Sequence, residues 1–396
     1  MRKVYLDNAA TTALSPRVLE AMLPYFTQYY GNPSSVHAFG REAKQGLDKA
    51  RDQVAKALHC DPSEVIFTGC GTESDNTVLL GVAQRYGNKG KHIITTNVEH
   101  HAILHTCEYL EKQGYEVTYL PVDQDGLVTA EQVAAAIRPD TILVSIMFAN
   151  NEVGTIMPIQ EIGAVCKEKG VLFHTDAVQA VGHIPVDVQA MHIDMLSMSG
   201  HKFHGPKGIG VLYARKGVPI FPLIHGGAQE RNRRGGTENI PAIVGMASAL
   251  DEACDHLDED TRKLTALRER LIAGLSKIPH SVLNGHREHR LPGTVNFCFE
   301  GIEGESLLLL LDDKGVYASS GSACTSGSLD PSHVLLAIGR PHEIAHGSLR
   351  LSLSPDTTEE EVDYMVKAVT DVVVYLRSIS PVWRNLEAGI QEFIIQ

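Results

Sequence analysis

Two apolar strands joined by a polar, glycine-rich turn are indicated by residues 194–210, Asp194-Met-Leu-Ser-Met-Ser-Gly-His-Lys-Phe-His-Gly-Pro-Lys-Gly-Ile-Gly210. Lys202 directly follows the first of these strands. Desolvation at the end of a buried strand disfavours a charged ammonium group, and a neutral amine can form a Schiff base. The alternative is an exposed lysine in a hairpin turn. Lys207 shows the ambiguity, since it lies equally close to glycines, and we assign it no role.

Short apolar strands and helical segments alternate around this stretch, from about residue 40 to residue 215. The expected strands are 65–67, 92–95, 116–120, 142–147, 171–174, 195–198 and 210–213. The expected helices between them are 41–58, 76–86, 101–113, 130–137 and 159–169. Helices that alternate with short strands rich in Val, Ile and Leu require crossover connections. The pattern therefore predicts an α/β fold with a mostly parallel, seven-stranded sheet covered on both faces.

The pattern of expected helices and strands changes in the C-terminal third, and the new pattern predicts a second, smaller α+β domain. A long amphipathic helix is expected at 241–270. It is followed by a strand at 294–299, a leucine-rich helix at 305–313, a Ser/Gly loop, a strand at 348–352 and a final helix from Thr358. We predict a large domain at 15–257 and a small domain formed by 1–14 and 258–396, joined through a helix.

Composition excludes several classes of function. The chain has 396 residues and a formal net charge of −13, whereas a nucleic-acid binder needs surplus cations. It has no run of about 20 apolar residues and no apolar stretch after the basic N-terminus, which predicts a cytoplasmic protein without membrane contact. Its seven cysteines are odd in number and include no CxxC pair, which disfavours both a disulfide framework and a structural zinc site.

A second strand, within Val171-Leu-Phe-His-Thr-Asp-Ala-Val-Gln179, also ends in a polar cluster. Open α/β sheets bind their ligands at the carboxyl ends of their strands. An acid such as Asp176 at that edge can pair with a protonated pyridine nitrogen, as in enzymes that use pyridoxal phosphate. The alternative, that Asp176 caps the next helix, is equally compatible with the pattern.

Two Gly/Thr turns are candidate phosphate sites. In Phe67-Thr-Gly-Cys-Gly-Thr-Glu-Ser-Asp-Asn76, glycines end a strand, and Thr72 is followed three residues later by Asp75. This spacing predicts a capping box, and the free N–H groups at a helix start suit a phosphate. A plain capped helix is the alternative. The segment Arg233-Arg-Gly-Gly-Thr237 is a second such turn and could add a phosphate contact.

The segment Ala318-Ser-Ser-Gly-Ser-Ala-Cys-Thr-Ser-Gly-Ser328 contains no aliphatic core former and no residue larger than threonine. With so little apolar area to bury, it is expected to be an exposed, mobile loop. Cysteine is usually buried, so Cys324 in such a loop indicates a reactive thiol whose thiolate is the nucleophile. An incidental exposed cysteine is the alternative.

Three histidines raise the question of a metal site. His101 and His105 are spaced to share one face of a helix, and His100 precedes them. The helix offers no acidic partner and the chain no obvious third ligand, so we predict no metal. An imidazole that stacks on a flat cofactor or transfers protons is the better use of His100.

Taken in order, these segments resemble the group I, NifS/IscS-like cysteine desulfurases, class-V aminotransferase relatives of fold type I that use pyridoxal 5'-phosphate. The resemblance covers nearly the whole chain, and the ordered set of motifs is more specific than any one of them. The motifs are Tyr5-Leu-Asp-Asn-Ala-Ala-Thr-Thr12, Gly31-Asn-Pro-Ser34, Gly71-Thr-Glu-Ser-Asp-Asn76, Glu99-His100, Asn150-Asn-Glu-Val-Gly154, Asp176, Gln179, Ser199-Gly-His-Lys202, Gly236-Thr-Glu-Asn239, Ser319-Ser-Gly-Ser-Ala-Cys-Thr-Ser326 and Arg350.

The resemblance implies a role for each matching residue. For the cofactor it implies a Schiff base with Lys202, an ion pair with Asp176 at the pyridine nitrogen, a contact of the ring hydroxyl with Gln179, and stacking on His100. The residues implied to hold the phosphate are Gly71, Thr72, Ser199 and His201, with Thr237 supplied by the other subunit of a homodimer. Those implied to bind the substrate carboxylate are Asn32, Asn151 and Arg350, and Asn151 also borders the cofactor. Ser354-Pro355 departs from the family pattern, in which a glycine and a different turn follow, so we expect a different backbone just beyond Arg350.

The function implied is conversion of L-cysteine to L-alanine, with the sulfur passing to Cys324 as a persulfide and then to an acceptor protein. The acceptor could be an iron–sulfur scaffold or a tRNA-thiolation enzyme. One alternative is a lyase for selenocysteine, cystine or a D-configured substrate on the same scaffold, since fold does not fix substrate. A second alternative, of another class, is a non-catalytic scaffold that binds iron or sulfur.

Overall fold

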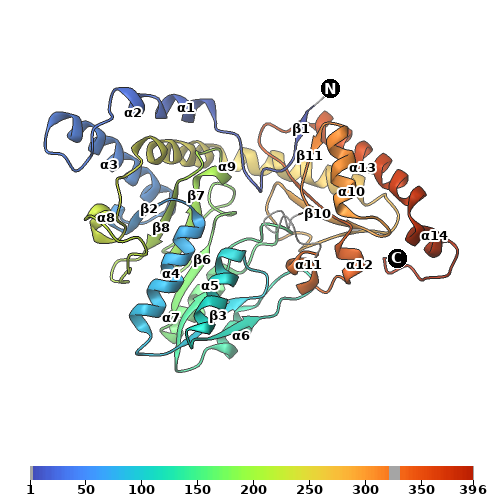
Figure 1. Ribbon diagram of the computed structural model, residues 1–396, viewed down its shortest axis with the longest axis horizontal. Helices are drawn as coiled ribbons and strands as arrows, with labels where there is room; N and C mark the ends of the chain where they lie inside the picture. The colour runs from blue at the N-terminus through green and yellow to red at the C-terminus, as the bar shows by residue number, and fades with distance from the viewer. Residues whose placement is uncertain (1–2, 321–330, 396) are drawn as a thin grey trace.

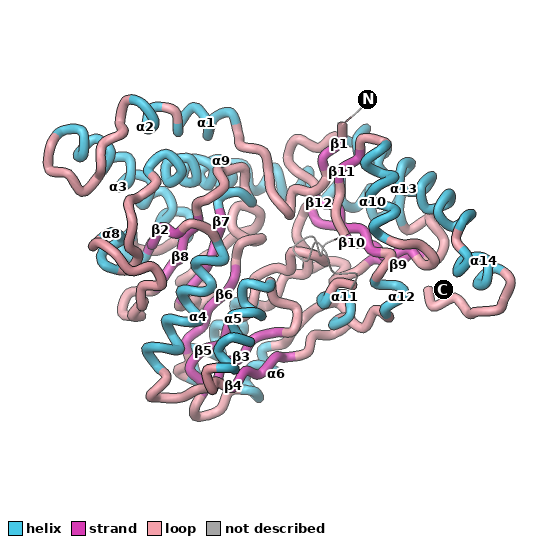
Figure 2. The backbone as a smooth tube through the Cα atoms, viewed as in Figure 1, coloured by secondary structure: helices cyan, strands magenta, loops and turns pink. Residues whose placement is uncertain are grey.

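A twisted seven-stranded sheet forms the larger part of the molecule (Figures 1 and 2). The computed structural model describes residues 3–320 and 331–395. In spatial order the strands are β2 (Val65–Thr68), β8 (Gly210–Ala214), β7 (Met195–Ser199), β6 (Leu172–Asp176), β5 (Thr141–Ser145), β3 (His92–Thr96) and β4 (Glu116–Leu120). Strand β8 runs in the direction opposite to the other six strands. The predicted α/β fold with a mostly parallel seven-stranded sheet is thus confirmed.

Helices cover both faces of this sheet because successive strand residues point to opposite sides. On one face, Ile93 and Leu143 join a core cluster with helices α4 (Gly71–Tyr86) and α5 (His101–Lys112). On the other face, the next residues, Ile94 and Val144, join a second cluster. That cluster includes residues of α3 (Ala38–Leu58), α6 (Ala130–Ala136), α7 (Ile159–Lys169) and the long α9 (Ile240–Leu275).

A smaller α+β unit stands beside the sheet, as Figure 1 shows. Its antiparallel sheet has the order β12 (Ser348–Ser352), β10 (Thr294–Phe299) and β9 (Ser281–Leu283), and β1 (Val4–Tyr5) pairs with β11 (Val316–Tyr317). Helices α10 (Gly304–Asp313) and α13 (Glu359–Ile379) pack on it and form a separate core cluster. The remaining helices are α1 (Pro16–Met22), α2 (Pro24–Thr27), α8 (Gln229–Asn232), α11 (His333–Ala337), α12 (His342–Ala345) and α14 (Pro381–Glu387), with 3-10 turns at Pro62–Glu64 and Gly200–Lys202.

Two details of the expected secondary structure are wrong. Helix α4 begins at Gly71, five residues before the expected start, and its N-cap is Cys70 without a side-chain hydrogen bond. Thr72 therefore lies inside the first turn and forms no capping box with Asp75. The helix from Thr358 is not the last, because Ser380 ends α13 and caps α14, which starts at Pro381.

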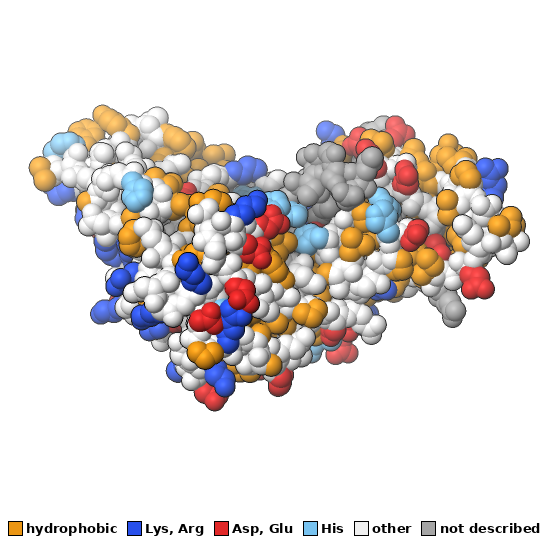
Figure 3. Space-filling view, turned by 60° about the horizontal axis from the view of Figure 1, so that its bottom comes forward, with side chains coloured by type: hydrophobic (Ala, Val, Ile, Leu, Met, Phe, Trp, Pro, Cys, Tyr) orange, Lys and Arg blue, Asp and Glu red, His pale blue; other side chains and the backbone are white. Residues whose placement is uncertain are grey.

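The expected domain division at residue 257 falls inside α9, which runs without interruption from Ile240 to Leu275. The division stays a prediction. On the face drawn in Figure 3, basic and acidic side chains lie interspersed over the larger part of the molecule. Across residues 3–320 and 331–395, none of the helices combines the length and the apolar character that crossing a bilayer requires.

Candidate active site

A cavity of about 470 Å³ lies at the carboxyl edge of the sheet, where open α/β sheets bind ligands. It is bordered by the ends of β6 and β7, the start of α4, the residues that follow β3 and β5, and Arg350 from the smaller unit. Most of the predicted site residues line it, namely Gly71, Thr72, His100, Asn151, Asp176, Gln179, Ser199, His201, Lys202 and Arg350. Segments far apart in sequence thus meet in one place.

Lys202 reaches the cavity from the 3-10 turn that continues β7. Its Nζ donates hydrogen bonds to the backbone carbonyls of Ala9 at 2.7 Å and Ala10 at 2.9 Å. The side chain is half-buried, which differs from the exposed hairpin lysine of the alternative interpretation. Lys207 is exposed and donates to the carbonyl of Thr12 at 3.2 Å. The two lysines of this segment therefore lie in different environments.

Asp176 is the last residue of β6 and lines the same cavity as Lys202. Its Oδ1 accepts a hydrogen bond from the backbone N–H of Val178 at 2.9 Å. Burial raises the pKa of Asp176, while His100, the N–H of Val178 and Lys202 act to lower it. A buried carboxylate of this kind is suited to a cation, and the ring nitrogen of a protonated pyridine is one.

The start of α4 provides a cradle for an anion. The first N–H groups of a helix have no intrahelical partner, and the helix dipole favours negative charge there. A Cβ added at Gly71 would lie 2.6 Å from Cγ2 of Val178, so a side chain at this position would fill the cradle. Ser199 Oγ is buried at the cavity without a hydrogen-bond partner among the described residues. A phosphate oxygen would accept a hydrogen bond from this hydroxyl.

His201 and His100 border the cavity on different elements. His201 Nδ1 lies 3.1 Å from Thr11 Oγ1, and burial together with nearby Lys202 and Lys207 lowers the pKa of His201 to about 4. It is therefore neutral at neutral pH. His100 caps α5, where its Nδ1 accepts a hydrogen bond from Ala102 N at 3.1 Å.

The histidines beside His100 form a small cluster of rings. The ring of His101 lies 4.8 Å, centroid to centroid, from those of both His105 and His333. Burial and these neighbours lower the pKa of His101 to about 4. No group of three or more His, Cys, Asp or Glu side chains is placed to hold a metal ion within residues 3–320 and 331–395.

Arg350 lies on β12 and borders the cavity. The sequence predicts that its guanidinium binds the carboxylate of the substrate. Only 3% of the residue is exposed. Its guanidinium donates to Asp7 Oδ1 at 2.8 Å and to the carbonyl of Asn151 at 3.0 Å, while its Nε is buried without a hydrogen-bond partner among the described residues. The strand stays regular here, since Arg350 pairs with Asn296 in the ladder, so Ser354-Pro355 does not distort it.

Two buried carboxyl groups near the cavity were not singled out as functional residues from the sequence. Asp75 is 1% exposed and Glu99 is fully buried. Glu99 Oε1 accepts hydrogen bonds from Thr96 Oγ1 at 2.7 Å and from Met147 N at 3.0 Å. Burial raises the pKa of Glu99 to about 8, so its carboxyl is mostly protonated at neutral pH. Their local sequence carried no signal of burial, because Asp75 in α4 and Glu99, directly before the N-cap of α5, both stand in polar motifs.

We expect the Glu99→Gln variant to gain stability relative to wild type as the pH rises. The pKa of Glu99 is about 8 in the folded protein and 4.5 in a model peptide. Because the folded protein holds the proton of Glu99 more tightly than the unfolded chain does, this proton stabilises the fold fully below about pH 4.5. The stabilisation is lost as the pH rises through about 8. The wild-type free energy of unfolding should therefore fall relative to the variant, by at most about 1.4 kcal/mol per pH unit.

Urea denaturation of both proteins at several values between about pH 5 and pH 8 measures this difference. Glu168→Gln is the matched control, because Glu168 is exposed on α7 and its substitution should give no such trend. A wild-type-to-variant difference that does not change with pH would contradict the assignment.

Two predicted site residues, Asn32 and Thr237, do not line the cavity, and the position of a third is not described. Asn32 is exposed between α2 and α3, where its Oδ1 accepts a hydrogen bond from Ser34 N at 2.9 Å. Thr237 is exposed ahead of α9, in a segment tied to the start of α4 by the Arg234–Glu73 ion pair at 2.9 Å. Cys324 lies outside the described residues. The roles of all three stay predictions.

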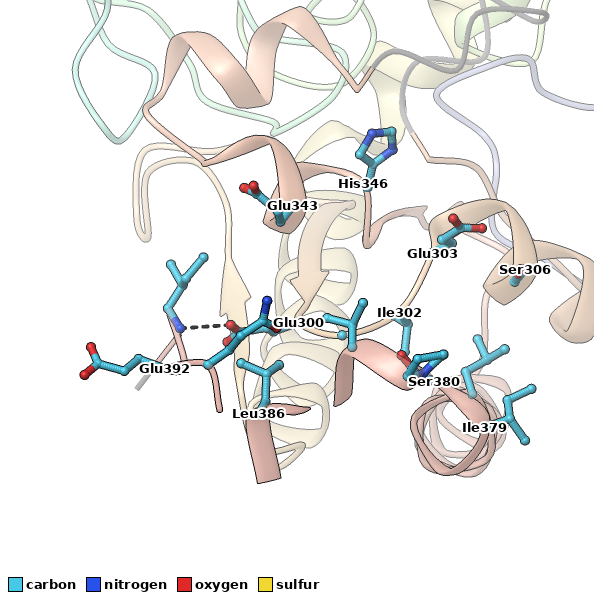
Figure 4. Close-up of a pocket in the computed structure, with 16 residues that line it drawn as sticks. Glu300, Ile302, Glu303, Ser306, Glu343, His346, Ile379, Ser380, Leu386 and Glu392 are labelled. Atoms are coloured by element: carbon cyan, nitrogen blue, oxygen red, sulfur yellow. Dashed lines mark hydrogen bonds between the residues drawn. The ribbon is translucent and has the colours of Figure 1, made fainter. Parts of the chain in front are cut away.

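A second, larger hollow of about 760 Å³ lies in the smaller unit and shares no lining residue with the first (Figure 4). Apolar side chains such as Leu386 and Ile302 line it, with the carboxylates of Glu303 and Glu343 at its edge. Glu300 Oε1 accepts a hydrogen bond from Ile394 N at 2.8 Å, which fixes the C-terminal segment against it. None of the residues predicted to perform chemistry contributes to it.

Comparison with known proteins gives the same family as the fold and the cavity. The aminotransferase class-V family profile matches residues 4–365, and the chain belongs to this family. A cysteine desulfurase IscS of Methanosarcina thermophila is 58% identical over 380 residues, which are 96% of this chain and 94% of the relative. One of Clostridium botulinum is 54% identical over 97% of this chain and 98% of the relative.

Solved structures also resemble the chain. A "NifS-like protein" has a TM-score of 0.90 and 44% identity, covering 95% of this chain and all of the other. "SspA in complex with cysteine" has a TM-score of 0.81 and 38% identity, covering 90% of this chain and all of the other. These identities extend the likeness beyond the fold to the sequence itself.

Proposed function

We propose that the protein is a cysteine desulfurase that uses pyridoxal 5'-phosphate and converts L-cysteine to L-alanine and a persulfide. The observation that carries this proposal is that one cavity brings together the amine of Lys202, the buried carboxylate of Asp176 and the guanidinium of Arg350. The amine of Lys202 can form a Schiff base with an aldehyde cofactor, and the carboxylate of Asp176 can pair with the ring nitrogen of that cofactor. The guanidinium of Arg350 can bind the carboxylate of an amino-acid substrate. The names of the relatives and the bound cysteine in one solved neighbour support the choice of substrate.

Several residues of the cavity fit pyridoxal phosphate. Gly71, Thr72, Ser199 and His201 would hold its phosphate, with Thr237 of a second subunit. Asp176 would pair with its ring nitrogen, while Gln179, His100 and Asn151 would border the ring. When bound, the cofactor withdraws electrons from the α-carbon of an attached amino acid. The fit rests on the unpartnered hydroxyl of Ser199 and on the cradle at Gly71.

The protein's own groups would perform the remaining steps. Lys202 accepts the α-proton of the substrate, and His100 assists proton transfer in the cavity. The thiolate of Cys324 attacks the sulfur of the substrate, so that a sulfur–sulfur bond forms and the carbon–sulfur bond breaks. The carbon keeps the electron pair and takes up protons to give alanine, while the sulfur stays on Cys324 as a persulfide.

Arg350→Lys should raise the KM for L-cysteine more than it lowers kcat. The guanidinium of Arg350 is held by Asp7 and by the Asn151 carbonyl, which aims its other donors at a carboxylate. Lysine keeps the charge but loses the bidentate geometry, and a lost hydrogen bond to a charged group corresponds to about a tenfold or larger increase in KM. Steady-state kinetics measures both constants. An unchanged KM would contradict the assignment, and Arg340→Lys, outside the cavity, is the control.

The test of the function is product analysis with several substrates. Alanine should form in amounts equal to the sulfur released from L-cysteine, and a yellow protein whose colour is lost with hydroxylamine should resist chelators. Faster turnover of D-cysteine, cystine or selenocysteine would identify the lyase alternative. A protein that binds iron and forms no alanine would identify the scaffold alternative.

The partners follow from the same proposal. An acceptor protein takes the persulfide sulfur from Cys324, for iron–sulfur assembly or tRNA thiolation, and two chains form a homodimer in which each supplies Thr237 to the other. We place this reaction in the cytoplasm. Analytical ultracentrifugation tests the dimer.

A further inference from the structure

Asp75 is a buried carboxyl group to which the proposed reaction assigns no role. It lies in the second turn of α4, on the face that also buries Val78 and Leu79. Its side chain nevertheless lines the same cavity as Asp176. Oδ1 of Asp75 is buried without a hydrogen-bond partner among the described residues. A carboxylate with an unpaired buried oxygen is costly, so this group needs an explanation.

Among residues 3–320 and 331–395, no lysine or arginine forms an ion pair with Asp75. The nearest ring is His174, whose Nε2 lies 3.7 Å from Asp75 Oδ1. That ring already interacts with Ser145 Oγ at 2.8 Å and Ser197 Oγ at 3.0 Å. Full burial lowers the pKa of His174 to about 3, so the imidazole is neutral. Asp75 therefore has a polar neighbour and no counter-charge there.

Neighbouring carboxyl groups further disfavour the ionised form of Asp75. The carboxyls of Asp176 and Glu99 both interact unfavourably with a charged Asp75, and burial is the largest cause that raises its pKa. The register of the sheet explains this proximity, since Asp176 on β6 lies opposite Ser197 on β7, and Ser197 acts to lower the pKa of Asp75. Three carboxyls thus share one buried region, and they cannot all be ionised.

Of the three, Asp176 is the best placed to carry the charge. It accepts the N–H of Val178, and both His100 and Lys202 act to stabilise its ionised form. Within the described part of the chain, Asp75 has neither a comparable backbone donor nor an ion pair with a lysine or an arginine. The proposed function places one proton on the ring nitrogen of the cofactor, and one carboxylate balances one such proton.

We propose that Asp75 is a positioning residue that keeps its proton in the folded enzyme, so that the cluster presents a single carboxylate charge, that of Asp176, to the ring nitrogen. This inference rests on the proposed use of pyridoxal phosphate. A neutral Asp75 prevents a second charge from competing for the ring proton or from repelling Asp176. The carboxyl of Glu99 is also protonated and therefore adds no second charge to the cluster.

The matched variants Asp75→Asn and Asp176→Asn test this, because each makes the same chemical change at one wall of the same cavity. Asparagine resembles a protonated aspartate, so Asp75→Asn should keep the dissociation constant of pyridoxal phosphate within about threefold of wild type. Asp176→Asn removes the charge and should weaken binding at least about tenfold. In nitrogen-15 NMR of labelled cofactor, the ring nitrogen should stay protonated in Asp75→Asn and lose its proton in Asp176→Asn.

Equal losses in both variants, or a lost ring proton in Asp75→Asn, would overturn the proposal. Infrared spectroscopy provides a measurement that does not need the cofactor. At about pH 7 the wild-type spectrum should contain carboxylic-acid bands of both Asp75 and Glu99, and Asp75→Asn should lose one of them and keep the other. A wild-type-minus-variant difference spectrum without a carboxylic-acid band would also overturn the proposal. If the protein binds no pyridoxal phosphate, the proposed function fails, while the infrared band still reports whether Asp75 is protonated.

Discussion

Replacing Lys202 with alanine should abolish covalent attachment of pyridoxal phosphate and lower the rate of alanine formation by about 10²–10⁴-fold. The amine of Lys202 lies on the wall of the cavity that Asp176 also lines, positioned by two backbone carbonyls. Its removal takes away both the tether and the base to which we assign the α-proton. Borohydride reduction followed by peptide mass spectrometry should label residue 202 in wild type and no residue in the variant.

Lys207→Ala is the matched control for this experiment. Lys207 lies in the same turn but is exposed, so its loss should leave the label at residue 202 in place. A stable reduced adduct on a different lysine of the wild-type protein would refute the assignment of Lys202.

Replacing Cys324 with serine should reduce alanine formation from L-cysteine more than about 100-fold, because a hydroxyl does not replace a thiolate as the nucleophile toward sulfur. Binding of the cofactor should survive, since Cys324 is not among the residues to which we assign the cofactor. The two effects separate the thiol's chemistry from the integrity of the cavity. Alanine assays and the absorption spectrum of the bound cofactor measure them.

Cys254→Ser provides the comparison, because Cys254 is an exposed thiol on α9 and has no assigned role. It should behave as wild type. Normal alanine production by Cys324→Ser would show that the sulfur leaves by another route. Unchanged lysis of selenocysteine by that variant would agree with the proposal, because such lysis needs no thiol.

The sheet could be predicted from the sequence because its strands are buried on both faces. Strands such as β5 and β7 are apolar over most of their length, and the helices between them have the period of an amphipathic surface. The expected strands and helices therefore match the structure to within a few residues in most cases. The start of α4 could not be predicted in this way, since Gly71 and Thr72 are typical of a loop and become helical only when packed on the sheet.

The candidate site was predictable where its residues end strands. Asp176 and Lys202 could be placed at one edge of the sheet from the order of the strands alone. The pairing of Arg350 with Asp7 could not, because the two residues are separated by 343 positions and meet only in the folded chain. The burial of Asp75 was hidden for a similar reason, since a plausible local capping pattern competed with its tertiary environment.

The most direct test of the account is mass spectrometry of the peptide that contains Cys324, taken after brief exposure of the protein to L-cysteine labelled with a sulfur isotope. We predict that this cysteine gains one labelled sulfur atom while one alanine is released for each atom gained. Alanine production with the label on another cysteine, or on none, would contradict it.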